Sequence, residues 1–137
     1  MRWSSLSLLV AFCLSVGLTS AAQAQNTATN SAQQNSVLAP YDPQLIRLSE
    51  ILGAVHYLRS LCGASEGQKW RDQMQALIEA ENPDVNRRGQ MAGAFNRGYR
   101  GFQRTHKDCT DASRLLADRY MREGSQIASL VATRYGN

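Results

Sequence analysis

The sequence predicts an all-α fold, a four-helix antiparallel bundle held by one disulfide. Four stretches carry apolar residues three and four positions apart, which is the repeat of an amphipathic helix. No stretch alternates apolar and polar residues with a period of two, and no Asn-Gly or Asp-Gly hairpin turn occurs. A length of 137 residues corresponds to a single domain.

Residues 1–24 have the order of features found in a secretory signal peptide. A basic start containing Arg2 precedes an apolar run from Leu6 to Leu18, which is too short to span a bilayer, and Ala22-Gln23-Ala24 is a typical cleavage site. The alternative is a buried core segment. Cys13 follows Phe12, where a lipoprotein signal requires a small residue, so no lipid anchor is expected. We therefore expect a periplasmic protein with no transmembrane segment.

Residues 25–40 are expected to form a flexible, disordered tether. They are uncharged and consist mostly of Gln, Asn, Thr, Ser and Ala, with little that can pack into a core. The helical bundle domain is therefore assigned to residues 41–137.

The first helix is expected to begin at Asp42, which can cap it, with Pro43 in the first turn. Gly63 is its natural end. Its apolar stripe contains Leu45, Leu48, Ile51, Leu52, Val55 and Cys62.

Three further helices follow. The second is predicted from about Ser65 to just before Asn82, and Asn82-Pro83 then opens a third that continues to about Lys107. Asp108 or Thr110 caps the fourth, which ends at Gly136. Their stripes contain Trp70, Met74, Leu77 and Ile78, then Phe95, Tyr99 and Phe102, then Leu116, Tyr120, Ile127 and Val131.

Removal of the signal peptide leaves two cysteines, Cys62 and Cys109, so only one pairing exists. Exported proteins keep their disulfides, and closing a loop of this size stabilises a domain by about 4 kcal/mol in the chain-entropy model. In an up-down-up-down bundle the two cysteines fall at the same end. The alternative, a redox or metal role, lacks a C-x-x-C motif.

Several charged residues fall in or beside the apolar stripes when each helix is drawn on a 100° wheel. Burying such charges is expensive unless they are paired, so we expect Arg–Glu pairs across the bundle. The alternative is a polar pocket in which Glu66 or Glu123 acts as a general base. The inward charges are Arg59, Glu66, Glu81, Arg88, Arg119, Glu123 and Arg134.

The third helix has a basic face opposite its aromatic stripe, formed by Arg97, Arg100 and Arg104 together with Gly89 and Gly93. Glycine in a helix interior costs about 1 kcal/mol relative to alanine. Two glycines on an exposed face therefore suggest that a partner, or an anion held by arginine forks, approaches closely. The alternatives are a merely solvated face or a groove for a neighbouring helix of the same bundle.

No catalytic, metal or cofactor signature is found, and an enzyme is not expected. His56 and His106 lack a second ligand at helical spacing, and there is no C-x-x-C-H, G-x-S-x-G or phosphate-binding glycine loop. The formal charge of +4 falls to +3 when Arg2 is removed with the signal peptide. Because the protein is expected to be exported, nucleic acid is not expected to be the target of this charge.

The chain also resembles a family of small, uncharacterised exported proteins of alphaproteobacteria, a domain of unknown function. The resemblance covers roughly residues 45–137 and implies a periplasmic location, with no activity, ligand or catalytic residue. It rests on Leu58-Arg59-Ser60-Leu61-Cys62-Gly63, Gln68, Trp70-Arg71, Gln73-Met74, Ala94-Phe95-Asn96-Arg97-Gly98-Tyr99-Arg100, Cys109-Thr110 and Arg134-Tyr135-Gly136-Asn137.

These features favour a helical binding or adaptor protein of the cell envelope that acts through protein–protein contacts at the arginine-rich face. The alternative ligand is an anion such as lipid phosphate or peptidoglycan carboxylate, with Trp70 or Tyr99 as an apolar floor. Glycine-lined faces also make homodimers, so self-association stays open.

Overall fold

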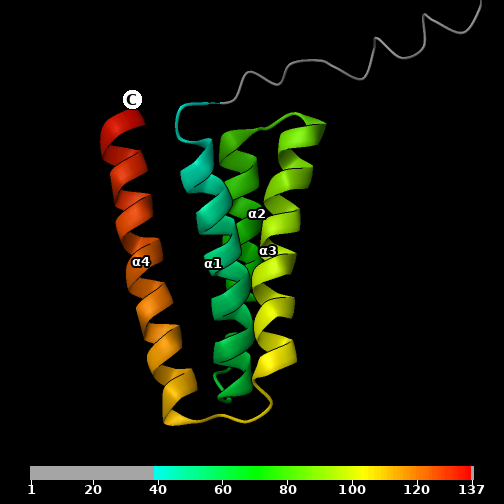
Figure 1. Cartoon of the computed structure of the whole chain (residues 1–137). Helices are drawn as coiled ribbons and strands as arrows, with labels where there is room; N and C mark the ends of the chain where they lie inside the picture. Colours follow the sequence, from blue (N-terminus) through cyan, green and yellow to red (C-terminus); the bar gives the residue numbers. More distant parts are fainter. Residues whose placement is uncertain (1–38, 137) are drawn as a thin grey trace, which may run out of the picture. The chain divides into compact units, whose positions relative to one another are not determined.

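The computed structural model describes residues 39–136, which form four α-helices and contain no strand (Figure 1). The predicted all-α, four-helix fold is confirmed. The predicted signal peptide and residues 25–38 of the predicted tether lie outside the described residues. The helices are α1 (Asp42–Leu61), α2 (Lys69–Glu81), α3 (Val85–Thr105) and α4 (Asp111–Tyr135).

Helix α1 is the centre of the arrangement, and successive helices reverse direction around it (Figure 1). The backbone of α1 lies close to those of α2, α3 and α4, whereas the backbone of α4 approaches that of α1 alone. Within α1 only Pro43 and Ser60 are exposed, as expected for a helix with neighbours on several sides. The bundle is therefore not closed between α2 and α4.

Glycine allows α1 and α3 to pack closely. A methyl group on Gly53 of α1 would overlap the carbonyl oxygen of Phe95, and one on Gly98 of α3 would overlap that of Glu50. Ala54 and Ala94 are also fully buried. The cost of glycine in a helix is thus offset here by backbone contact.

A cluster of buried apolar side chains joins the first three helices. It consists of Leu52 from α1, Met74 and Ile78 from α2, and Met91 from α3. No helix within residues 39–136 is long and apolar enough to cross a bilayer.

The disulfide predicted between Cys62 and Cys109 is present, with the two Cα atoms 4.9 Å apart. Cys62 directly follows α1, and Cys109 lies in the short connection before α4. The bond therefore ties the outlying helix α4 to the end of the central helix.

The ends of the helices differ from the predictions in three places. Asp42 is the first helical residue, with Tyr41 at the cap position. Helix α2 begins at Lys69 and not near Ser65 as predicted. Gly63 adopts a positive φ of 74°, and turns occupy the residues between it and Lys69.

Asn82 does not open α3. It ends α2 in the left-handed conformation, and Asp84 caps α3 by accepting a hydrogen bond from the Arg87 amide. Thr110, one of the two predicted caps of α4, accepts from the Ser113 amide.

Candidate binding surfaces

The first candidate surface is the basic side of α3, here called the arginine face and defined as Gly89, Gly93, Arg97, Arg100 and Arg104. The three arginines and Gly89 are exposed, and Gly93 is half-buried. None of the three arginines forms an ion pair with any residue between 39 and 136. Helix α3 contains no Asp or Glu from its first residue to its last. Within the described part of the chain, the face is therefore a cationic surface without internal neutralisation.

The aromatic residues of α3 hold this face outward by packing on the other side of the helix. Tyr99 lies against His56 and Tyr57 of α1, with ring centroids 5.3 and 5.4 Å away, and Phe102 lies 5.5 Å from Tyr120 of α4. Because these contacts fix the rotation of α3, the arginine face points away from the core.

The glycines of the arginine face have no packing role in the described part of the chain. A methyl group on Gly89 would meet nothing, and one on Gly93 would touch only the Arg97 guanidinium, at 3.6 Å. By contrast, a methyl carbon on Gly124 of α4 would lie 3.1 Å from the Ile51 side chain. The helix-weakening glycines at 89 and 93 thus remain unexplained by the fold.

Glu66 and Arg59 form one of the inward ion pairs. The Arg59 Nε and Nη2 atoms each donate a hydrogen bond of 3.0 Å to the Glu66 carboxylate, and the Trp70 indole donates a third at 3.2 Å. The bonds from Arg59, followed by that from Trp70, lower the pKa of Glu66 although partial desolvation opposes them.

Glu123 is held in the same way, but by Arg47 of α1. Arg47 donates two hydrogen bonds of 2.7 and 3.1 Å to its carboxylate, and these lower the pKa of Glu123 while raising that of Arg47. Neither Glu66 nor Glu123 therefore has the raised pKa that would suit a general base at neutral pH.

The most deeply placed ion pairs join three helices at Arg87. Its side chain, 12% exposed, contacts Asp42 at 2.6 Å and Glu81 at 2.8 Å. Sequence reasoning assigned this role to Arg88, which is exposed. On a helical wheel Arg88 falls within the predicted stripe of Phe95, Tyr99 and Phe102. The buried residues of α3 are instead Met91, Ala94 and Gly98, which lie on the side of the helix that carries Arg87.

The prediction that Arg119 and Arg134 are inward, paired charges was also wrong. Both are exposed, and neither forms an ion pair within residues 39–136. The prediction placed them inward because the helical wheel puts them in or beside the apolar stripe of α4. Since the α4 backbone approaches only α1, side chains at the edges of its stripe face solvent.

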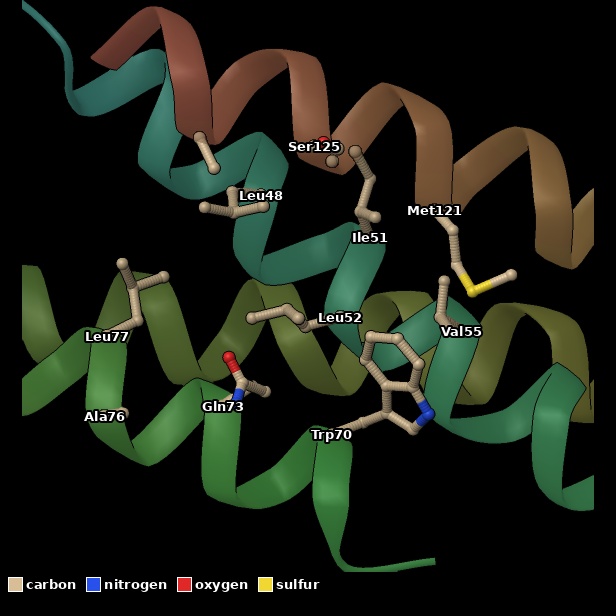
Figure 2. A pocket seen from close by; sticks show the side chains of 12 residues that line it. Leu48, Ile51, Leu52, Val55, Trp70, Gln73, Ala76, Leu77, Met121 and Ser125 are labelled. Atoms are coloured by element: carbon tan, nitrogen blue, oxygen red, sulfur yellow. The ribbon is translucent and has the colours of Figure 1, made fainter. Parts of the chain in front are cut away.

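The second candidate surface is an apolar groove of about 420 Å³ that lies between α2 and α4 and has α1 at its base (Figure 2). Its floor is formed by Leu48, Ile51, Leu52 and Val55 of α1. The α2 wall contains Trp70, Gln73, Ala76 and Leu77, and the α4 wall contains Met121, Gly124, Ser125 and Ala128.

Figure 2 shows how the groove is shaped. The side chains of Trp70 and Met121 converge on Val55 at one end. At the other end the groove continues into a second hollow of about 260 Å³, which shares Leu48, Leu77 and Ala128 with the first and is also lined by Tyr41 and Tyr135.

The groove was not predicted, because sequence reasoning placed α4 in a closed bundle. A signal was present in the small residues Gly124, Ser125, Ala128 and Ala132, which share one side of α4. Trp70 lies in this groove and Tyr99 lies half-buried between α1 and α3, so neither forms a floor beneath the arginine face.

The two histidines occupy different surroundings. His56 is buried between three helices, and His106 lies 5.2 Å from Phe102, measured between ring centroids. In the part of the chain that the structure describes, no three His, Cys, Asp or Glu residues gather as they would around a metal ion.

Comparison with known proteins adds one finding. A family model described as "Protein of unknown function (DUF2385)" matches residues 40–135. No curated protein and no solved structure matches the chain.

Proposed function

We propose that this chain, which belongs to the DUF2385 family, is a helical binding module that docks an acidic partner protein on its arginine face. The observation that carries the proposal is the contrast between two sets of arginines. Arg47, Arg59 and Arg87 are bound to carboxylates of the fold, whereas Arg97, Arg100 and Arg104 are exposed and form no ion pair within residues 39–136.

Three guanidinium groups on one helical face suit a protein carrying Asp or Glu at matching spacing. Each arginine can donate two parallel hydrogen bonds to a carboxylate, and such charge-assisted bonds are roughly twice as strong as neutral ones. A single exposed ion pair contributes only about 0–1 kcal/mol. The proposal therefore requires several pairs that become desolvated together in one interface.

The glycines of the arginine face support close docking. With no side chain at 89 or 93, a partner can approach the α3 backbone on the two turns before Arg97. The surface is also preorganised by the close α1–α3 packing, which reduces the ordering cost of association.

We place this activity in the periplasm, as a protein of the cell envelope. Two features support that location: the predicted signal peptide at residues 1–24 and the disulfide between Cys62 and Cys109.

Site-specific cross-linking in intact cells tests the proposal. A photoreactive amino acid at Asn96, exposed on α3, is compared with one at Ser129, exposed on α4. We expect a protein adduct from position 96 that disappears in Arg97→Glu/Arg100→Glu. The matched control Arg122→Glu/Arg134→Glu changes the charge equally on exposed α4 positions and is expected to keep the adduct.

The alternative occupant is an anionic envelope ligand, because arginine forks bind phosphate as well as carboxylate. In that case position 96 would label lipid or glycan in place of protein, and binding to isolated envelope fractions would weaken steeply with salt. An unchanged protein adduct in the Arg97→Glu/Arg100→Glu variant would show that the arginine face is the wrong surface.

A further inference from the structure

His56 lies at the junction of three helices and is almost completely buried, with 6% of its surface exposed. From α1 its ring reaches Phe95 and Tyr99 of α3, with centroid distances of 5.9 and 5.3 Å. On the remaining side, its Nε2 atom accepts a hydrogen bond of 3.2 Å from Nε of Arg71 on α2. A titratable ring therefore links α2 to the centre of the fold.

The hydrogen bond assigns the protonation state of the ring. Because the Arg71 Nε–H donates, Nε2 of His56 carries a lone pair, and the proton of the neutral ring is on Nδ1. Nδ1 is buried and has no partner among the described residues. A second proton, added at Nε2, would remove the acceptor and place two cations in direct contact.

Among the described residues, the surroundings of His56 offer no compensating negative charge. The titratable or charged groups that face it are Arg71 from α2 and Tyr99 from α3. On α1, Arg59 is bound to Glu66, and α4 meets α1 elsewhere, through Arg47 and Ile51. Burial, and after it the charge of Arg71, lowers the pKa of His56.

Helix α2 is the helix whose attachment depends most on the His56–Arg71 hydrogen bond. It contributes only Met74 and Ile78 as buried residues, and its polar anchors to the rest of the fold are few. Glu66 just before it is bound to Arg59, Arg71 to His56, and Glu81 at its end to Arg87. Of these three anchors only the His56–Arg71 bond contains a histidine, the side chain whose ordinary pKa lies nearest to neutrality.

We propose that His56 and Arg71 form an acid-sensitive latch: protonation of His56 releases α2 from α1 and opens the α2 wall of the apolar groove. Trp70, Gln73 and Leu77, which line that wall, lie on the same short helix as Arg71. Helix α4, the opposite wall, stays attached through Cys62–Cys109 and the Arg47–Glu123 pair.

Amide hydrogen exchange of the disulfide-bonded protein, corrected for intrinsic exchange rates, tests the latch. As the pH falls from neutrality to about two units below the ordinary histidine pKa, we expect protection of α2 amides to fall at least tenfold while α4 amides keep theirs. His56→Gln supplies an oxygen acceptor that does not titrate, so its α2 protection should not depend on pH in this range. His106→Gln is the control and should behave as the wild type does.

Arg71→Gln provides a second route, because Arg71 is exposed and its replacement leaves the core intact. It keeps an amide donor for Nε2 but removes the positive charge, so the acid loss of α2 protection should shrink. The latch is refuted if α2 and α4 lose protection together in the wild type, or if both His56→Gln and Arg71→Gln respond to acid as the wild type does.

Discussion

Gly53 of α1 faces the carbonyl oxygen of Phe95 on α3 so closely that no side chain fits between the two helices. Gly98 makes the reciprocal approach from α3 to the carbonyl oxygen of Glu50. This contact fixes the rotation of α3 about its axis, and with it the outward direction of the arginine face.

The close contact predicts opposite effects of the same substitution at two glycines. Gly53→Ala should lower the free energy of unfolding by about 2 kcal/mol or more, because the helices must move apart to admit the methyl group. Gly89→Ala should raise it by about 0.5–1 kcal/mol, since its methyl group meets nothing. Urea denaturation of both variants measures the difference. A loss of stability at Gly89 would mean that this residue has a packing role.

The disulfide should contribute a large part of the stability of the domain. Cys62→Ser/Cys109→Ser, or reduction of the wild type, is expected to lower the free energy of unfolding by about 2–5 kcal/mol, because the unfolded chain regains conformational freedom. Thermal denaturation with and without reductant is the measurement. Adding reductant to the double variant should change nothing, and an unaffected wild type would show that the bond contributes no stability.

The ion pairs at Arg87 should be far more sensitive to mutation than exposed charges nearby. Arg87→Met leaves Asp42 and Glu81 buried without a cation, with side chains only 8% and 16% exposed, and should cost roughly 3–5 kcal/mol. Arg88→Met is the matched control on an exposed neighbour and should change stability by less than about 0.5 kcal/mol. Equal losses in the two variants would contradict this assignment of the pairs.

The Arg47–Glu123 pair predicts a pH dependence of stability. Because the folded-state pKa of Glu123 lies below its ordinary value of 4.5, its contribution is present above pH 4.5 and is lost as the pH falls through the folded pKa. The stability difference between wild type and Glu123→Gln should therefore shrink in acid.

Denaturant midpoints measured across this range provide the test. Glu79→Gln alters an exposed carboxylate whose hydrogen-bond partner is Gln75, and it should show no comparable trend. A Glu123 difference that stays constant with pH would mean that Arg47 and Glu123 are not coupled.

The helices and the disulfide could be predicted from the sequence, because neither prediction requires knowledge of how distant segments pack. Helical spacing is a property of neighbouring residues, and two cysteines allow a single pairing. Arg87 was missed in favour of Arg88 because the prediction centred the buried face of α3 on its aromatic side chains. The residues that the structure buries, Met91, Ala94 and Gly98, lie on the side of the helix that carries Arg87. The groove was missed because its two walls belong to helices whose backbones do not meet, an arrangement that no spacing within one helix encodes.

The central claim is that the arginine face binds an acidic protein. Its most direct test is to purify the partner that cross-linking identifies and to measure its affinity for the wild-type protein and for variants of the arginine face. We expect Arg97→Glu/Arg100→Glu to weaken binding at least tenfold, a loss of about 1.4 kcal/mol or more, and binding of the wild type to weaken as salt is added. Arg122→Glu/Arg134→Glu should bind as the wild type does. Equal affinity of the wild type and the Arg97→Glu/Arg100→Glu variant would contradict the claim.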